Sequence, residues 1–378
     1  MDNILELFPE TYESSRQRFR ENLATIQKYW PEAKSSAHYI SGDEDLSIDW
    51  IYSDGLEQND KVLIFTTGEH GVECYVGSAM LQRFIDEYLP RLNPKTTGLL
   101  LVHAINPWGM KNHRRVNASN IDLNRTFLYD GMFDPHFNPE YDSVDAFLNP
   151  KKQVRNLTLD NLRFYAHLIS RLIRMGKNAL KYTVLLGQYR HPQGLFYGGT
   201  GYQEETSTII DLYRETFNSY NQILHLDMHT GYGPRFQMSL VNSAFDTLSS
   251  QEYVRKFNYP LVVAANPEEF YAVQGDMIDF VYTLCQQEFP NKSLYSTSFE
   301  FGTLGDTAHQ QAGSPRAMVL ENQMYFHGAA DEKLANRIKH DFEELFNPGA
   351  SDWRRKTVED ADKAFEGILS GEGYFLEN

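Results

Sequence analysis

An apolar strand signal, a helical segment and a second strand signal follow one another in the first third of the chain. The run "KVLIFTT" (61–67) is short and apolar, "YVGSAMLQRFIDEYLPRL" (75–92) has helical periodicity, and "TGLLLVHAIN" (97–106) is again apolar. Two strands joined through a helix lie parallel in one sheet, and the helix covers a face of that sheet. The sequence therefore predicts an α/β fold with a mixed, largely parallel central sheet flanked by helices.

Further strand and helix signals continue this pattern through the rest of the chain. Strand signals occur at 222–230, 236–242, 259–266 and 293–302. Helical signals occur at 157–182, 204–220, 276–289 and in a charged tail that begins at Ala317. Because no repeat and no Gly/Ser/Pro-rich linker interrupts the chain, we expect a single domain over residues 1–378, with helical insertions and a helical C-terminal tail.

The charge balance limits the classes of partner. The chain carries 51 Asp and Glu against 35 Lys and Arg, a net charge of −16. Such a charge disfavours nucleic acids and anionic membrane surfaces as partners. The N-terminus lacks the basic and then apolar layout of a secretory signal, and no apolar stretch approaches the roughly 18 residues that suggest a membrane span.

Cysteine content indicates the compartment. Cys74 and Cys285 are the two cysteines, and they allow at most one disulfide. We read this as a reducing, cytoplasmic setting, in which both side chains pack as small apolar groups. The oligomeric state is left open.

His70 and Glu73 stand three residues apart in "TTGEHGVECYVG" (66–77), where the first strand signal gives way to a helix. A catalytic zinc ion takes three protein ligands from nitrogen and oxygen donors and leaves a fourth position for water. A corner between strand and helix lets two side chains with this spacing aim at one point. The pair alone is weak support, since the spacing is common by chance.

A third donor is expected at the end of the strand in "ILHLDMHTGYG" (223–233). His229 lies at its corner, and the carboxyl ends of neighbouring parallel strands open at one edge of the sheet, where α/β proteins bind ligands. His225 is the competing candidate. Its apolar neighbours Leu224 and Leu226 favour a histidine packed in the core, so we prefer His229.

Two more segments concentrate polar groups. The segment "RRVNASNIDLNRTF" (114–127) carries arginines and Asn124, whose donors suit a carboxylate, although its composition also fits a surface loop with solvated charges. In "STSFEFGTLG" (296–305), Glu300 interrupts an otherwise apolar and hydroxyl-bearing strand. A carboxylate there is costly to bury without a partner, and a general base beside a metal-bound water would be a reason for it.

In this order, "GEHGVE", "NIDLNRTF", "DMHTG" and "FEFG" resemble four motifs of the zinc carboxypeptidase superfamily. That superfamily comprises the carboxypeptidase A-like enzymes and their aspartoacylase and succinylglutamate desuccinylase relatives. The similarity covers about residues 60–325, and the chain looks closest to a peptidase-like bacterial branch.

The resemblance implies one zinc ion held by His70, Glu73 and His229. It implies that Asp122 accepts a hydrogen bond from the first ligand histidine, as carboxylates behind metal ligands do. It also implies that Glu300 is the general base and later the proton donor to the leaving amine.

For substrate binding, the resemblance implies that Asn124 and Arg125 hold the terminal carboxylate. An arginine usually polarises the scissile carbonyl. Alignment to carboxypeptidases places that group near Lys111, and alignment to aspartoacylases favours Arg115; we choose Arg115, with Arg114 in reserve.

Some features stay open. Arg235 is a further candidate for an anion contact, and residues 187–205 form either an ordered loop over the cleft or a structural connection. The family's assisting tyrosine cannot be selected by spacing from Tyr271, Tyr282 and Tyr295, although Tyr282 fits a core position better.

The motifs together predict a zinc-dependent hydrolase that cleaves an amide bond next to a free carboxylate. A carboxypeptidase acting on a small peptide is preferred to a deacylase of N-acyl amino acids, because the long chain leaves room for a broader cleft. A non-catalytic module that binds peptide termini is the alternative of another class. Retention of Glu300 speaks against it, since a binding module has no use for a base.

Overall fold

The central sheet has eight strands in the residues that the computed structural model describes, which are 3–43, 45–265, 273–304 and 308–376. Their spatial order is β1-β2-β4-β3-β5-β8-β6-β7. The strands are β1 Lys34–Tyr39, β2 Ser47–Ser53, β3 Lys61–Thr67, β4 Thr97–His103, β5 Gln222–Thr230, β6 Met238–Asn242, β7 Val262–Ala264 and β8 Ser293–Phe301. Strands β4, β3, β5 and β8 are parallel to one another, whereas β2 and β6 run antiparallel to their neighbours in this block.

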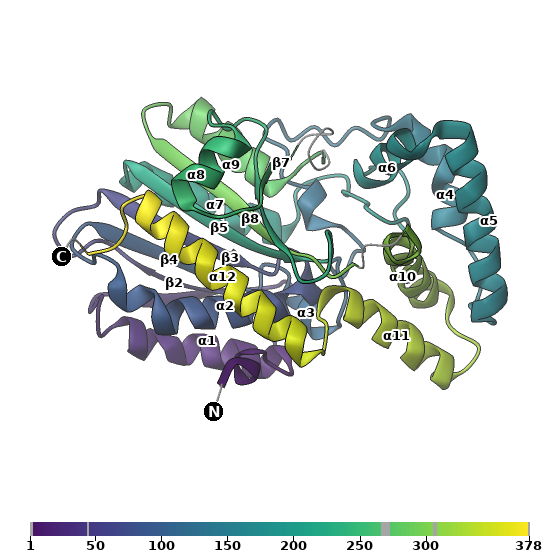
Figure 1. Cartoon of the computed structure of the whole chain (residues 1–378), viewed down its shortest axis with the longest axis horizontal. Helices are drawn as coiled ribbons and strands as arrows, with labels where there is room; N and C mark the ends of the chain where they lie inside the picture. The colour runs from purple at the N-terminus through teal and green to yellow at the C-terminus, as the bar shows by residue number, and fades with distance from the viewer. Residues whose placement is uncertain (1–2, 44, 266–272, 305–307, 377–378) are drawn as a thin grey trace.

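Helices cover both faces of the sheet (Figure 1). The helices α1, α2 and α12 contribute to the apolar core on one face, and α7 and α9 to the core on the other. The α-helices are α1 Tyr12–Ile26, α2 Cys74–Glu87, α3 Pro107–Lys111, α4 Asp142–Leu148, α5 Leu157–Met175, α6 Lys177–Leu185, α7 Glu204–Ser219, α8 Ser250–Phe257, α9 Met277–Glu288, α10 Ala308–His327, α11 Glu332–Phe346 and α12 Ser351–Gly371. The short 3-10 helices are η1 Asn3–Leu7, η2 Gly71–Glu73, η3 Leu89–Arg91, η4 Leu123–Arg125 and η5 Pro139–Tyr141.

The predicted mixed, largely parallel sheet flanked by helices is confirmed, as is the helical C-terminal part, α10 to α12. The expected strand, helix and strand of the first third are β3, α2 and β4. The helical signal at 157–182 is divided into α5 and α6 by Gly176, whose φ of +79° leaves the helical range. The pair β1 and β2 was not predicted, because β1 has no apolar alternation and is mostly exposed at the edge of the sheet.

The parallel block brings three chain corners to one edge of the sheet. Thr67 ends β3 next to Met228 of β5, and His229 of β5 pairs with Glu300 of β8. After β3 the chain turns tightly at Gly71, where an added Cβ would lie 2.1 Å from the carbonyl carbon of Gly109. Only glycine permits this close approach, which fixes the direction of His70 and Glu73.

Helices α4, α5, α6, α10 and α11 lie beyond this end of the sheet (Figure 1). Both cysteines are free and buried, as expected for small apolar packing. No helix in the described part of the chain is long and apolar enough to cross a membrane.

Candidate metal centre

His70, Glu73 and His229 converge, although they come from two separate corners of the sheet. The Nδ1 atom of His70 lies 3.0 Å from Oε1 of Glu73, and Nδ1 of His229 lies 3.2 Å from Oε2 of the same carboxylate. The two Nδ1 atoms are 3.2 Å apart. Donors about 2.0–2.1 Å from a tetrahedral zinc ion lie roughly 3.3 Å from one another, so the donor set and its spacing fit a metal ion.

Each ring is held from behind by a carboxylate at its other nitrogen. The Nε2 atom of His70 lies 3.0 Å from Oδ1 of Asp122, and Nε2 of His229 lies 2.5 Å from Oδ2 of Asp227. An Nε2–H donor to each carboxylate leaves the Nδ1 lone pair for a metal. The backbone N–H of Thr230 donates to Oε2 of Glu73 at 2.9 Å and fixes the third donor.

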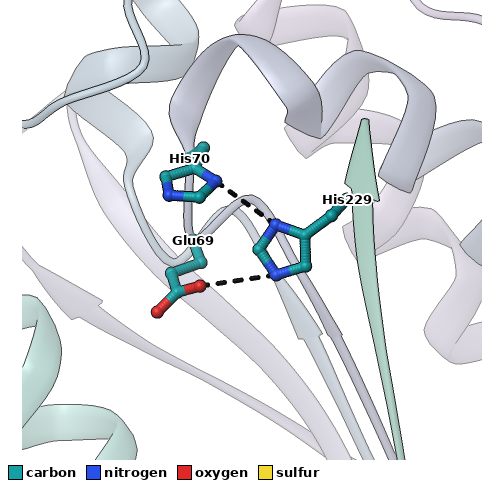
Figure 2. A group of neighbouring side chains, drawn as sticks. All are labelled: Glu69, His70 and His229. Atoms are coloured by element: carbon teal, nitrogen blue, oxygen red, sulfur yellow. Dashed lines mark hydrogen bonds and ion pairs between the residues drawn. The ribbon is translucent and has the colours of Figure 1, made fainter. Parts of the chain in front are cut away.

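Glu69 offers an alternative to Glu73. Glu69, His70 and His229 also have donor atoms within 4.8 Å of one another. Glu69 and His70 face different nitrogens of the His229 ring (Figure 2): Oε2 of Glu69 lies 3.4 Å from Nε2, the nitrogen that Asp227 already contacts. An ion shared by the two Nδ1 atoms is next to Glu73, so we infer that Glu73 is the better third donor.

The electrostatics of the cluster call for a cation. Burial would raise the pKa of Glu73, but His70, His229 and Arg115 outweigh it and hold that pKa well below its usual range. Burial would lower the pKa of His229, yet Asp227 and then Glu73 raise it well above the ordinary value. Buried carboxylates thus draw positive charge to the point where the two rings meet.

Glu69 behaves differently from Glu73. Its side chain is fully buried, and neither carboxylate oxygen has a hydrogen-bond partner among the described residues. Burial, followed by repulsion from Asp227, raises the pKa of Glu69 well above its usual value and so favours the neutral form. A neutral carboxylic acid is a poor metal ligand.

Glu300 lines the same cavity as the three converging residues. Its Oε1 accepts a hydrogen bond of 2.9 Å from the backbone N–H of Tyr232. Burial, followed by repulsion from Glu73, raises the pKa of Glu300 to about 8. A nearby cation would lower this pKa, so the group sits in a range suited to taking and returning a proton.

The two adjacent arginines point to different places. Arg115 lines the cavity, where Nη1 donates to Oε1 of Glu73 at 2.8 Å and Nε donates to Oδ2 of Asp122 at 3.2 Å. Arg114 does not line that cavity; its Nε donates to Glu321 at 2.7 Å. The charge of Arg114 is thus paired with Glu321, which favours Arg115 over the reserve choice Arg114 as the group beside the substrate.

Asn124 and Arg125 both line the cavity, and each makes hydrogen bonds to neighbouring residues. The amide of Asn124 donates to Asp276 at 3.1 Å and accepts from the backbone N–H of Met277 at 2.9 Å. The Nη atoms of Arg125 donate to the carbonyls of Asn124 and Leu185 at 2.7 and 2.8 Å. Its Nε has no hydrogen-bond partner among the described residues.

Other expected contacts lie elsewhere. Arg235 is not among the residues that line the described cavity, and its guanidinium lies 5.4 Å from the ring centre of Phe236, so its role as an anion contact stays a prediction. Lys111 faces Glu13 at 3.6 Å.

Residues 187–205 contribute Phe196 to the cavity wall, and a Cβ on Gly187 would lie 2.5 Å from the side chain of Arg125. This segment is therefore packed against the site.

Two of the three candidates for an assisting tyrosine are engaged outside the cavity. Tyr282 donates to Asp246 from helix α9, and Tyr295 donates to Asn242 at 3.0 Å inside the sheet, so both are occupied away from the cavity. Tyr271 lies outside the described residues. Tyr232, which sequence reasoning did not single out, lines the cavity directly after β5.

Sequence reasoning also missed Asp227. The signal was present in "HLDMH", where His225, Asp227 and His229 alternate with Leu226 and Met228 and therefore share one face of β5. Leu224 and Leu226 adjoin His225 in sequence, but their side chains point to the opposite face of β5. His225 itself is buried and hydrogen-bonded to Thr66 and Ser296, as expected for a core histidine.

The chain is similar to several solved structures at low identity. Bovine thrombin-activatable fibrinolysis inhibitor, in complex with tick carboxypeptidase inhibitor, is 14% identical with a TM-score of 0.44, covering 86% of this chain and 97% of that one. Carboxypeptidase A from Helicoverpa armigera is 11% identical with a TM-score of 0.42, covering 88% and 73%. An aspartoacylase family protein from Mesorhizobium loti is 14% identical with a TM-score of 0.37, covering 78% and 67%.

These values are too low to carry a functional conclusion, and no curated protein matches the chain. A protein family does match: residues 8–360 match the family described as "Protein of unknown function (DUF2817)". That match spans most of the 378 residues. The chain therefore belongs to the DUF2817 family.

Proposed function

We propose that this protein is a zinc-dependent hydrolase that cleaves an amide bond next to a free carboxylate, in the manner of a metallocarboxypeptidase. One observation carries the proposal: two imidazole nitrogens and a carboxylate lie 3.0–3.2 Å from one another, with Glu300 in the same cavity. The motifs that resemble the zinc carboxypeptidases supply the same residues.

Zinc is the ion that best suits two imidazoles and one carboxylate with a position left for water. When bound, zinc lowers the pKa of a coordinated water toward neutrality and polarises a carbonyl oxygen. Asp122 and Asp227 hold the two rings through their Nε2 atoms. These contacts keep the donor nitrogens directed at one point.

Glu300 acts as the proton carrier. Its carboxylate takes a proton from the attacking water and later gives a proton to the leaving amine. The hydrogen bond from the backbone of Tyr232 holds one of its oxygens, which leaves the other for the proton. Arg115, in the same cavity, supplies a positive charge beside the carbonyl oxygen as negative charge develops there.

Arg125 is the proposed partner of the substrate's carboxylate. Arg125 is 1% exposed, and among the described residues its two Nη atoms donate to neutral carbonyls, with an ion-pair contact to Asp122 at 3.9 Å. A buried cation with an unused donor is costly, and a substrate carboxylate would relieve that cost. Asn124, with both amide groups engaged, instead orients the start of α9 next to the cavity.

The test is a substrate panel assayed with the purified, zinc-loaded protein. Short peptides with a free C-terminus, the same peptides amidated, and N-acyl amino acids form the three arms. We expect hydrolysis of the free peptides and none of the amidated ones. Activity restricted to N-acyl amino acids would identify a deacylase, and no metal-dependent hydrolysis in any arm would favour the binding-module alternative.

A further inference from the structure

A row of buried polar side chains crosses the sheet directly behind His229. His225 and Asp227 share its face of β5, Thr66 lies opposite Asp227 on β3, and Ser296 lies opposite His225 on β8. Thr66, His225, Asp227 and Ser296 are all 0% exposed. The opposite face of β5 carries Leu224, Leu226 and Met228 in the apolar core, so the polar row is confined to one face.

The hydrogen bonds in this row have a defined direction. The hydroxyl of Thr66 donates to Oδ1 of Asp227 at 2.6 Å, so toward Nε2 of His225, 2.9 Å away, it can only accept. The proton of the His225 ring therefore lies on Nε2. Its Nδ1 is left to accept from the hydroxyl of Ser296 at 2.8 Å.

Tyr213 of α7 agrees with this direction. Its hydroxyl donates to the sulfur of Met277 at 3.2 Å, and it lies 3.1 Å from Nε2 of His225, where it accepts. The ring of His225 is thus fixed on both sides. Oδ1 of Asp227 accepts from Thr66, and the buried Oδ2, which no hydrogen bond among the described residues occupies, is left for the Nε2 atom of His229, its ion-pair partner.

An acceptor at Oδ2 of Asp227 determines the tautomer of His229. The two atoms Oδ2 and Nε2 are 2.5 Å apart, which places the His229 proton on Nε2. The lone pair of Nδ1 then faces His70 and Glu73. A carboxylate, an imidazole and a hydroxyl are costly to bury for stability alone, because apolar side chains of similar size usually stabilise a core as well or better.

We propose that Asp227, held by Thr66 and His225, is a positioning residue that turns the Nδ1 lone pair of His229 toward the metal. This inference rests on the proposed function, because it requires that His229 binds a metal. Carboxylates in this position typically contribute 10- to 100-fold to metal affinity. Thr66 acts one bond further away, so its effect is expected to be smaller.

The experiment measures zinc affinity by competition with a chelator, using the full-length protein. For D227N we expect affinity about 10- to 100-fold below wild type. Asn keeps the shape of the side chain, but its amide has one oxygen and one NH₂ group. Either Thr66 or His229 would therefore face an N–H donor where Asp227 offers an oxygen. T66V removes the donor to Asp227 and should lower the affinity several-fold, whereas T66S keeps the hydroxyl and should restore it.

Two further measurements separate positioning from loss of structure. D49N changes another buried carboxylate, that of Asp49 on β2, which accepts hydrogen bonds from Arg20 of α1 and from Ser47. This substitution should leave the zinc affinity unchanged. The visible absorption of the Co²⁺ form reports the ligand geometry, and we expect it to change in D227N and stay constant in D49N. Urea unfolding in chelator shows whether each variant is folded.

The outcomes are distinguishable. If the wild-type protein binds no zinc, both the proposed function and this inference fail. If the wild type binds zinc and D227N binds it within twofold with an unchanged Co²⁺ spectrum, this inference alone fails. It also fails if D49N weakens binding as much as D227N, because the effect would then be general destabilisation.

Discussion

The Nδ1 atoms of His70 and His229 lie 3.2 Å apart, although the two residues are 159 positions apart in the chain. The parallel pairing of β3 and β5 brings them together, because each histidine lies at or just past the carboxyl end of its strand. With the Nε2 atoms of both rings facing Asp122 and Asp227, the two Nδ1 lone pairs face each other and repel. A shared cation relieves that conflict.

Zinc affinity should separate Glu73 from Glu69 as the third ligand. E73Q removes a charged donor next to both Nδ1 atoms, so we expect a loss larger than the 10- to 100-fold typical of residues behind the ligands. E69Q replaces a carboxyl group whose pKa burial raises, at a site away from the two Nδ1 atoms, and should change affinity by no more than about threefold. Chelator competition measures both. An equal loss in the two variants would contradict the choice of Glu73.

Replacing Glu300 should affect turnover and spare metal binding. E300Q keeps the hydrogen bond from Tyr232 but cannot carry a proton, so kcat should fall by about 10²- to 10⁴-fold. Zinc content, measured by metal analysis, should stay at one equivalent per chain. E321Q is the matched control, because Glu321 pairs with Arg114 outside the cavity. Normal turnover in E300Q would remove Glu300 from the mechanism.

The central strands and the two corners that carry His70, Glu73 and His229 were predictable because local patterns determine them. An apolar run of seven residues such as β3 must be buried, and parallel neighbours place their polar corners at one edge. The edge strand β1 has no such pattern. Its pairing with β2 is satisfied by backbone hydrogen bonds, which leave no trace in the side chains.

The direction in which a long side chain points was not predictable. Arg114 and Arg115 are adjacent, yet the partner of one is Glu321 of α10 and the partners of the other are Glu73 and Asp122. The contact between Arg114 and Glu321 joins positions 207 apart, and no local pattern contains it. Asn124 is similar, because its partner Asp276 belongs to the start of a distant helix.

Arg125 should control the preference for a free carboxylate. R125Q removes the charge, so KM for a free peptide should rise by about tenfold or more, because a hydrogen bond to a charged group contributes about 1.5–3 kcal/mol. The amidated peptide lacks the carboxylate, so its KM should change little in R125Q. R125K keeps the charge but lacks the forked donors, so its KM for the free peptide should lie between the values for the wild type and R125Q. The measurement is KM and kcat for both peptides in each variant.

The control for Arg125 is Arg114, the other buried arginine of the same segment. R114Q leaves Glu321 buried without its ion pair and should cost about 3–5 kcal/mol of unfolding free energy. Its KM should stay at the wild-type value, because Arg114 does not line the cavity. A larger KM effect in R114Q than in R125Q would reverse the assignment of the two residues.

His103 should make the stability of the fold depend on pH. It is fully buried in β4, where Nε2 lies 2.8 Å from the hydroxyl of Ser15 and Nδ1 has no hydrogen-bond partner among the described residues. Burial, followed by repulsion from Arg18 and other arginines of α1, lowers the pKa of His103 to about 3. In the unfolded chain the pKa is about 6.5, so between these values the unfolded state binds more protons.

Stability from this residue is therefore complete above pH 6.5 and is lost as the pH falls toward 3. For a single group with these two pKa values, the loss between pH 6 and pH 4 is about 2–3 kcal/mol. Urea unfolding of the metal-free protein at several pH values measures it. H103Q removes the titrating group and should reduce the pH dependence by that amount, whereas H340Q, at an exposed site on α11, should not. Equal pH dependence in H103Q and wild type would show that His103 is not the group whose protonation opposes folding.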